Sequence, residues 1–337
     1  MIVYSERYLE HNMEYHPENN NRLRRTMSLL TKKNVFDSVA LIEPDPASKD
    51  DVLRVHTDQH LKLINEMSLK GGGMMGPDTY ITERSFDIAM LSAGGMITAL
   101  EQDEYKYAFT LIRPPGHHAT QNEAMGFCIF NNIAIGAKYA MEKLDKKRVF
   151  ILDFDVHHGN GTQDIFYNDP GVLFASLHQQ PLYPGTGRMN EIGSEEGEGY
   201  TLNIPLPPKT TNDLYLKAID EIVLPVLKEF DPELILVSTG YDGHYDDPLG
   251  DMCLSSHVYH NISKRIKRLD IKTIFTLEGG YNLDALSNSI YATMAPIFNL
   301  EKDFFDNPLE ENKKIAEYVT NRIETIKKIH KNYWGLS

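Results

Sequence analysis

The segment RVFILDFDVHHGNG, residues 148–161, joins a short apolar run to a loop of acids, histidines and glycines. The run at 148–152 is rich in Val, Ile, Leu and Phe and lacks the alternation of a half-exposed strand. Such a run is typical of a parallel strand that is buried on both faces. Asp153, Asp155 and His157 follow at alternate positions, so their side chains leave the strand on one side. We therefore expect this strand end to carry a functional site.

The rest of the chain repeats the pattern of a short apolar run followed by a longer amphipathic stretch. Further strands are expected at 107–112, 172–177, 234–238 and 273–277, and helices at 85–101, 131–144, 213–229, 255–268 and 283–298. Strands alternating with helices predict an α/β fold with a doubly wound parallel sheet. No linker or internal repeat divides the sequence. We expect a single domain, 1–337, with a C-terminal helix at about 309–331 packed on it.

Polar residues follow three other predicted strands in the same way. The segments are Arg113–His118, Thr239–His244 and Glu278–Asn282. In open α/β sheets the ligand site lies beyond the carboxyl ends of the strands, so these segments are expected to converge. A single Asp at a strand end more often caps the next helix than binds a metal. A pair of adjacent histidines, taken alone, is explained equally well by one histidine buried in the core beside one exposed to solvent. Three ligand-type residues followed by His-Gly-Asn-Gly favour a metal site.

Composition excludes several classes of protein. The 337 residues are 41% hydrophobic and carry a formal net charge of −14, with no Lys/Arg-rich block, so nucleic-acid binding is not expected. Two cysteines form no disulfide framework and suit a reducing compartment. The first residues contain no apolar signal segment, and no apolar run reaches about 18 residues, so we expect no membrane partner and a cytoplasmic location.

Seven motifs together resemble the histone deacetylase superfamily: RPPGHHA, GFCIFNN, DFDVHHGNGTQ, SLHQ, YPGTG, GYDGHYDDPLG and EGGYNL. The resemblance runs from about His16 to Leu283. It is class II-like, close to the stand-alone bacterial and archaeal deacetylases that include relatives of acetylpolyamine amidohydrolases. It implies the arginase/deacetylase fold, with a mainly parallel eight-stranded sheet and helices on both faces. It also implies zinc-dependent removal of acyl groups from amines.

By this resemblance, Asp155, His157 and Asp242 are the zinc ligands. One nitrogen and two carboxylates leave coordination positions for water and a carbonyl oxygen. Ferrous iron suits the same set.

The resemblance also implies catalytic roles. His117 matches the general base, and His118 matches the neighbour that assists it and protonates the leaving amine. Asp153 matches the partner of His117. Asn160 stands where class I enzymes have a second Asp, and an amide holds His118 without raising its pKa as a carboxylate would. Tyr281 matches the residue that polarises the scissile carbonyl and stabilises the oxyanion.

Substrate contacts are implied for five residues that line or back the acyl-lysine tunnel: Gly126, Phe127, Tyr183, Leu249 and Gly279. Arg22 matches an arginine of the internal channel that carries acetate away, although Asn20 replaces the usual proline of that loop.

Potassium binding is implied next to zinc. The inner set consists of Asp153, Asp155, His157, Ser176 and Leu177, several through main-chain oxygens. The outer set consists of Phe166, Asp169, Val172 and Tyr200.

The predicted function is hydrolysis of N-acyl-lysine in peptides or proteins. Leu249 gives a substrate cation no charge, whereas a glutamate there selects polyamines in relatives, so acyl-lysine is expected to be preferred over acetylpolyamine. Hydrolysis of acetylpolyamines or other small acylated amines is the alternative, and an inactive acyl-lysine-binding relative is a second. A two-manganese ureohydrolase of the same fold is a third, but the segment around Asp242 supplies only one carboxylate before Gly243. An oligomer is compatible with all of these.

Overall fold

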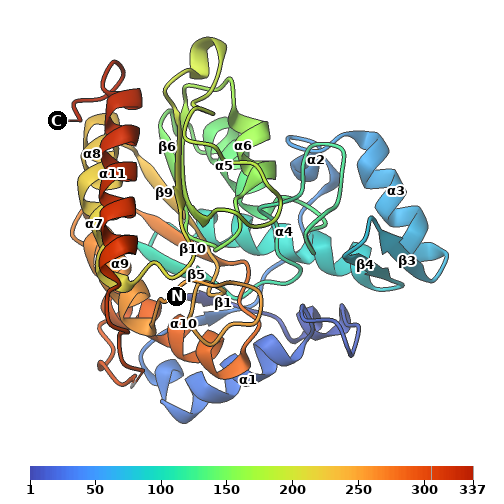
Figure 1. The fold of residues 1–337 in the computed structure, drawn as a ribbon. Coiled ribbons are helices and arrows are strands. Elements are labelled where there is room, and N and C mark those ends of the chain that lie inside the picture. Colours follow the sequence, from blue (N-terminus) through green and yellow to red (C-terminus); the bar gives the residue numbers. More distant parts are fainter. Residues whose placement is uncertain (305, 337) are drawn as a thin grey trace.

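The computed structural model describes residues 1–304 and 306–336, with the chain ends and elements arranged as in Figure 1. One parallel sheet of eight strands has the order β2-β1-β5-β10-β9-β6-β7-β8. In chain order its strands are β1 (Ile2–Val3), β2 (Leu41–Ile42), β5 (Tyr107–Thr110), β6 (Val149–Asp153), β7 (Val172–Gln179), β8 (Thr201–Leu206), β9 (Leu234–Thr239) and β10 (Thr273–Leu277).

A separate antiparallel hairpin pairs β3 (Gly72–Met75) with β4 (Thr79–Thr82). The helices are α1 (Asn21–Lys32), α2 (Lys49–Val52), α3 (Asp58–Leu69), α4 (Ser85–Glu101), α5 (Asn132–Lys143), α6 (Asn160–Phe166), α7 (Asn212–Ala218), α8 (Leu224–Phe230), α9 (Ser256–Lys267), α10 (Leu283–Phe298) and α11 (Lys313–His330). In Figure 1 the hairpin lies beside α3, on the side of the molecule away from α11.

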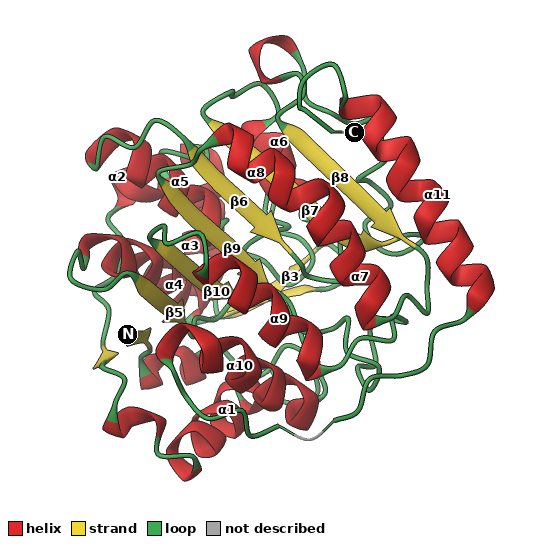
Figure 2. Ribbon diagram, turned by 90° about the vertical axis from the view of Figure 1, so that its left-hand side faces the viewer, coloured by secondary structure: helices red, strands yellow, loops and turns green. Residues whose placement is uncertain are grey.

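Helices cover both faces of the sheet. Figure 2 shows α7, α8 and α9 in front of the central strands and α4 and α5 behind them. Every residue of β6 and of β9 is buried, because each strand lies inside the sheet and between two helical layers. This arrangement confirms the doubly wound parallel sheet and explains why these strands are apolar on both faces.

All five predicted strands are present, and most predicted helices match closely. The segment expected to form one helix at 213–229 is instead divided into α7 and α8 by a wide π-turn at Ile219–Val223. Pro225 follows this turn and has no N–H to donate to the preceding turn. The C-terminal helix begins at Lys313, later than expected, because the Asn312 side chain caps it by accepting from the Lys314 N–H at 3.0 Å.

The prediction missed the strands β1, β2, β3, β4 and β8 and the helices α1, α2, α3 and α6. Two-residue strands such as β1 and β2 are too short to give a pattern. α11 packs against α7 and β8. Within residues 1–304 and 306–336, no helix is both long and apolar enough to span a bilayer.

Candidate active site

Four neighbouring strands deliver the predicted loops to one edge of the sheet. β5, β10, β9 and β6 are adjacent, and their carboxyl ends are in register: Asp153 pairs with Ser238, and Leu277 pairs with Thr239. The loops that follow these strands therefore meet, as the parallel-sheet argument predicts.

Three side chains in these loops form a compact group of metal-ligand type. Ligand atoms of Asp155, His157 and Asp242 all lie within 4.8 Å of one another. His157 Nδ1 lies 3.1 Å from Asp155 Oδ1 and 3.1 Å from Asp242 Oδ2. The remaining carboxylate oxygens accept main-chain N–H groups, of Gly279 at 2.8 Å and of Val156 at 3.0 Å. Each carboxylate is thus oriented before any ion binds.

The electrostatics of this group favour a cation. Both carboxylates are fully buried. Burial opposes charge on His157, but Asp155 and Asp242 outweigh it and raise the pKa of the ring to about 10. Burial and Asp155 also raise the pKa of Asp242 to about 6. A divalent ion would supply the positive charge that the carboxylates attract, and one nitrogen with two oxygens fits zinc or ferrous iron.

The adjacent histidines enter the same cavity but have different partners. His117 Nδ1 lies 2.9 Å from Asp153 Oδ2, and His118 Nδ1 lies 2.7 Å from Asn160 Oδ1. Burial disfavours charge on both rings. Asp153 and Asp155 nevertheless raise the pKa of His117 to about 10, whereas burial and the His117 ring lower the pKa of His118 well below its usual value. A pair of imidazoles that titrate apart can supply a base and an acid.

A cavity of about 270 Å³ leads to these groups, and Phe127, Tyr183, Leu249 and Tyr281 line it together with His118 and His157. The Phe127 ring meets Tyr281 edge-on, with centroids 5.6 Å apart, and the Tyr183 ring meets His118 edge-on at 5.2 Å. Aromatic walls around a polar end are suited to an aliphatic chain that carries an amide.

Two glycines allow this close packing. Gly126 has a positive φ of 56°, and a Cβ there would lie 2.3 Å from the His118 ring. A Cβ on Gly279 would lie 2.2 Å from Asp242 Oδ2 and 2.5 Å from Asp155 Oδ2. Gly279, which was expected to bind substrate, therefore lies directly against the carboxylates of the metal group.

Arg22 contacts the loop that follows β10 and carries Tyr281. Its guanidinium donates to the main-chain oxygens of Gly280 at 2.7 Å and Glu278 at 2.5 Å and to Glu18 at 3.1 Å, and it lies 5.0 Å from the centre of the Tyr281 ring. The bonds to Gly280 and Glu278 hold the main chain around Tyr281. Burial, opposed by Arg22, raises the pKa of the Tyr281 phenol well above its ordinary value, so the hydroxyl keeps its proton for donation.

Sequence reasoning assigned no role to three residues around this cavity. Leu182 and Asp78 line it. Asp247 lies beside it and accepts the main-chain N–H groups of Tyr281 at 2.6 Å and Leu249 at 3.0 Å. No local pattern distinguishes these acids from surface carboxylates, because tertiary packing alone brings them to the site.

The inner potassium set lies on adjoining strand ends. Ser176 Oγ lies 2.9 Å from His178 Nδ1, and the Leu177 carbonyl accepts the Tyr215 hydroxyl at 3.1 Å. Both residues lie on β7, where Ser176 pairs with Asp153 of β6. In the outer set, Asp169 forms an ion pair of 2.7 Å with Lys138, whose ammonium also lies 5.1 Å from the centre of the Phe166 ring. The ammonium of Lys138 thus already pairs with the carboxylate of Asp169, one member of the outer set.

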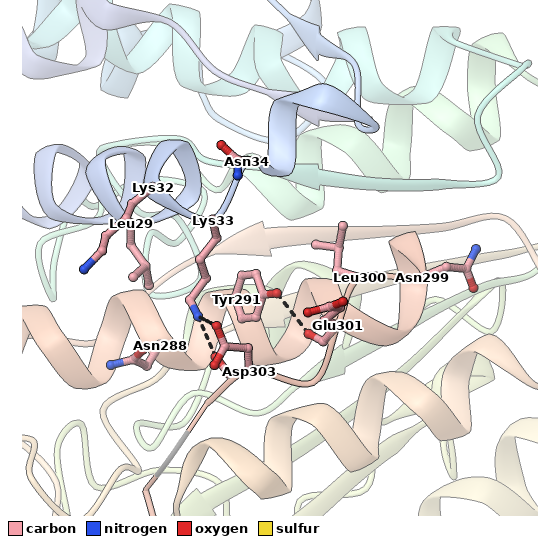
Figure 3. Close-up of a pocket in the computed structure, with 10 residues that line it drawn as sticks. All are labelled: Leu29, Lys32, Lys33, Asn34, Asn288, Tyr291, Asn299, Leu300, Glu301 and Asp303. Carbon is pink, nitrogen blue, oxygen red and sulfur yellow. Dashed lines mark hydrogen bonds and ion pairs between the residues drawn. The ribbon is translucent and has the colours of Figure 1, made fainter.

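A larger cavity, of about 750 Å³, lies elsewhere, between α1 and α10 (Figure 3). Lys33 donates to Asp303 Oδ2 at 2.5 Å, its ammonium lies 4.5 Å from the centre of the Tyr291 ring, and Tyr291 donates to the Glu301 carbonyl at 2.9 Å. These polar groups satisfy one another, and none of the predicted site residues lines the cavity.

The fold and the site define a hydrolase with the arginase/deacetylase architecture. The HD domain of HDA15, known from a crystal structure, matches it with a TM-score of 0.91 at 33% identity, covering 99% of this chain and 96% of that one. The histone deacetylase domain family matches residues 16–297, and the chain belongs to this family.

Two curated relatives agree with this assignment. A probable deacetylase of Archaeoglobus fulgidus is 42% identical over 354 residues, covering 99% of this chain and 98% of the relative. The histone deacetylase-like amidohydrolase of Pseudomonas aeruginosa is 40% identical over 276 residues, covering 79% and 73%. Family and relatives together support a deacetylase activity.

Proposed function

We propose that this protein is a metal-dependent amidohydrolase with one catalytic ion per chain, zinc or ferrous iron, that removes acetyl or other acyl groups from the side chain of N-acyl-lysine. The observation that carries the proposal is the cavity described above. Its aromatic walls, Phe127 and Tyr183, lead to His118, His157 and Tyr281 at one end. An acyl-lysine side chain, apolar along its length with one amide, has the matching chemistry.

The metal ligands in this proposal are Asp155, His157 and Asp242. The chemistry that a divalent ion supplies in such a site is polarisation of the carbonyl and activation of a water molecule. Its charge would also offset the carboxylates and lower the pKa of His117 towards the range that a general base needs.

The protein side chains then divide the proton transfers. His117, held by Asp153, takes a proton from the attacking water. The amine nitrogen receives this proton as the C–N bond breaks, and His118, held by Asn160, relays it, because the lowered pKa of His118 leaves its ring neutral until then. Tyr281 donates its hydroxyl to the carbonyl oxygen as negative charge develops there. The products are a carboxylate and a free amine.

Further parts of the proposal concern the whole protein. We propose one domain with α11 as part of it and a cytoplasmic location, which the two-cysteine composition suits. We also propose potassium at the inner set, which consists of Asp153, Asp155, His157, Ser176 and Leu177. Arg22 is assigned to the exit route of the carboxylate product. No nucleic-acid or membrane partner is proposed.

The decisive experiment uses enzyme loaded with a single defined metal. It compares kcat/KM for acetyl-lysine peptides, longer acyl-lysine peptides and acetylated polyamines. Turnover of the lysine peptides supports the proposal, and turnover of the polyamines alone replaces it with the small-amine alternative. Binding of acyl-lysine without turnover would indicate the inactive relative. Two tightly bound metal ions per chain would indicate a ureohydrolase-type centre.

A further inference from the structure

Glu278 is a buried carboxylate that the catalytic scheme does not use. It follows β10 directly and its residue is 1% exposed. Burial raises the pKa of its carboxyl group to about 7, while His117 and the Gly116 N–H oppose the shift. A buried acid is costly unless its oxygens are hydrogen-bonded, so its partners indicate its role.

Both oxygens of Glu278 are engaged. Oε2 accepts the main-chain N–H of Gly116 at 2.7 Å and that of His117 at 3.2 Å. Oε1 accepts the Ser238 hydroxyl at 3.1 Å. The Glu278 side chain thus joins the ends of β9 and β10 to the loop that carries His117.

The hydrogen bonds to Glu278 hold the main chain at Gly116 and His117. They complement the hydrogen bond that holds the His117 ring. Asp153 holds His117 through ring Nδ1 at 2.9 Å, whereas Glu278 holds the main-chain nitrogen of the same residue. The main chain at Gly116 packs closely against α5, because a Cβ there would lie 2.5 Å from the Asn132 nitrogen. Hydrogen bonds therefore hold both the main chain and the ring of His117.

A metal ion is a competing explanation, because ligand atoms of His117, Cys128 and Glu278 lie within 4.8 Å of one another. The contacts argue against it. His117 Nδ1 is bonded to Asp153, and the Cys128 thiol donates to the Gly126 carbonyl at 3.4 Å. Burial and Glu278 raise the pKa of that thiol well above its usual value, which disfavours the thiolate that a metal needs.

We propose that Glu278 is a positioning residue: its carboxylate fixes the main chain at Gly116 and His117 and so aims the His117 imidazole at the reacting water. The inference rests on the proposed function, since it presumes that His117 takes part in catalysis. A displacement of about 1 Å in such a group can cost on the order of 10²-fold in rate.

A matched pair of variants tests this. Glu278→Gln keeps the length and an acceptor oxygen for the two N–H groups, and its NH₂ can donate to Ser238 Oγ. Glu278→Met keeps the length and replaces both acceptor oxygens by a thioether, which is only a weak acceptor. Ser238→Ala is the control, because it removes the one bond of Glu278 that does not reach the histidine loop. The measurements are kcat, KM, metal content and the ¹H–¹⁵N signals of the Gly116 and His117 amides.

We expect Glu278→Met to lower kcat by about 10- to 100-fold, with KM within about threefold of wild type and full metal content. Glu278→Gln and Ser238→Ala should stay within about fivefold of the wild-type kcat. At about pH 8.5, where the Glu278 carboxyl group is ionised, the Gly116 amide proton should lie further downfield in wild type than in Glu278→Gln, because a charged acceptor makes the stronger hydrogen bond.

Four results would overturn the inference: wild-type kcat in Glu278→Met, an equal loss in the Gln and Met variants, a loss of metal, or a change in KM alone. If Glu278→Met fails to fold, the Gly116 amide shift in Glu278→Gln decides, and an unchanged shift counts against the contact. The amide measurement needs no turnover. An inactive wild-type enzyme would therefore reject the proposed function while the placement of Glu278 is still tested.

Discussion

The imidazole rings of His117 and His118 have centroids 4.0 Å apart, and their pKa values shift in opposite directions: burial at His117 is outweighed by Asp153 and Asp155, whereas burial and the neighbouring His117 ring lower the pKa of His118. The two rings are neighbours in sequence and in space, but Asp153 holds the His117 ring and Asn160 holds the His118 ring.

Replacing this amide tests the difference. Asn160→Asp places a carboxylate against His118 Nδ1, which lies 2.7 Å from Asn160 Oδ1. A negative charge favours the protonated ring, so the limb of the kcat/KM pH profile that belongs to His118 should move to higher pH. Profiles of the two enzymes that superimpose would contradict this role for His118.

Tyr281→Phe removes the hydroxyl proposed to stabilise the oxyanion. Deletion of one such donor costs about 2–4 kcal/mol of transition-state stabilisation, so kcat should fall by roughly 30- to 900-fold with metal content unchanged. Tyr183→Phe is the control, since it removes a hydroxyl from the other aromatic wall of the same cavity. If the Tyr281 variant keeps the kcat of this control, the hydroxyl has no part in the reaction.

Asp242→Ala deletes one of three proposed metal ligands and leaves Asp155 and His157 as an incomplete set. Metal analysis after dialysis should show strongly reduced occupancy, and activity should be lost. Asp246→Ala, an exposed acid four residues later, serves as the control and should bind metal normally. Stoichiometric metal and normal turnover in Asp242→Ala would remove Asp242 from the ligand set.

Leu249→Glu should increase the preference for acetylated polyamines over acetyl-lysine peptides. A carboxylate near a substrate ammonium is worth about 1 kcal/mol in water and several at lower effective dielectric, whereas leucine offers no charge. Asp78 already places one acid on the same cavity, so the comparison uses ratios of kcat/KM. Leu182→Glu is the control for added charge at another point of the wall. A ratio unmoved by Leu249→Glu, or a wild-type preference for polyamines, rejects this assignment of Leu249.

Stability should fall as the pH drops below about 6.5, and His330 on α11 should contribute. This ring is fully buried, neither nitrogen has a hydrogen-bond partner among the described residues, and burial lowers its pKa to about 4. Below pH 6.5 the His330 imidazole binds a proton in the unfolded chain, whereas in the folded state it stays neutral until the pH approaches 4. Stability is therefore lost at up to about 1.4 kcal/mol per pH unit as the pH falls towards 4.

His330→Leu removes this titration, so denaturant unfolding should show a gain in stability that is larger at pH 5 than at pH 7.5. His16→Leu, a partly exposed histidine on another element, is the comparison. An equal effect of His330→Leu at both pH values would contradict the predicted proton linkage.

Sequence reasoning succeeded for features that depend on residues close together along the chain. The run before Asp153 predicts a buried strand because a parallel strand between helical layers needs apolar residues on both faces. The spacing of Asp155 and His157 predicts a shared side because side chains alternate along an extended chain. The roles of single residues came from the resemblance and await the variants described above.

The sequence pattern failed where contacts are distant or elements are short. β1 and β2 contain two residues each, and their place in the sheet depends on pairing with each other and with β5. The sequence assigns no role to Glu278 or Asp247 themselves. Each accepts a main-chain N–H from a residue more than thirty positions away, Gly116 for Glu278 and Tyr281 for Asp247, and only the folded chain brings these groups together.

The bond from Arg22 to the Gly280 carbonyl joins residues 258 positions apart and has a consequence for biosynthesis. A growing chain contains Asp155, His157 and Asp242 before residue 280 has been added. The loop that carries Tyr281 is made later, and only then can Arg22 donate to the carbonyls of Glu278 and Gly280. A chain that stops short of residue 278 therefore lacks the main-chain partners of Arg22 and the Tyr281 side of the aromatic cavity.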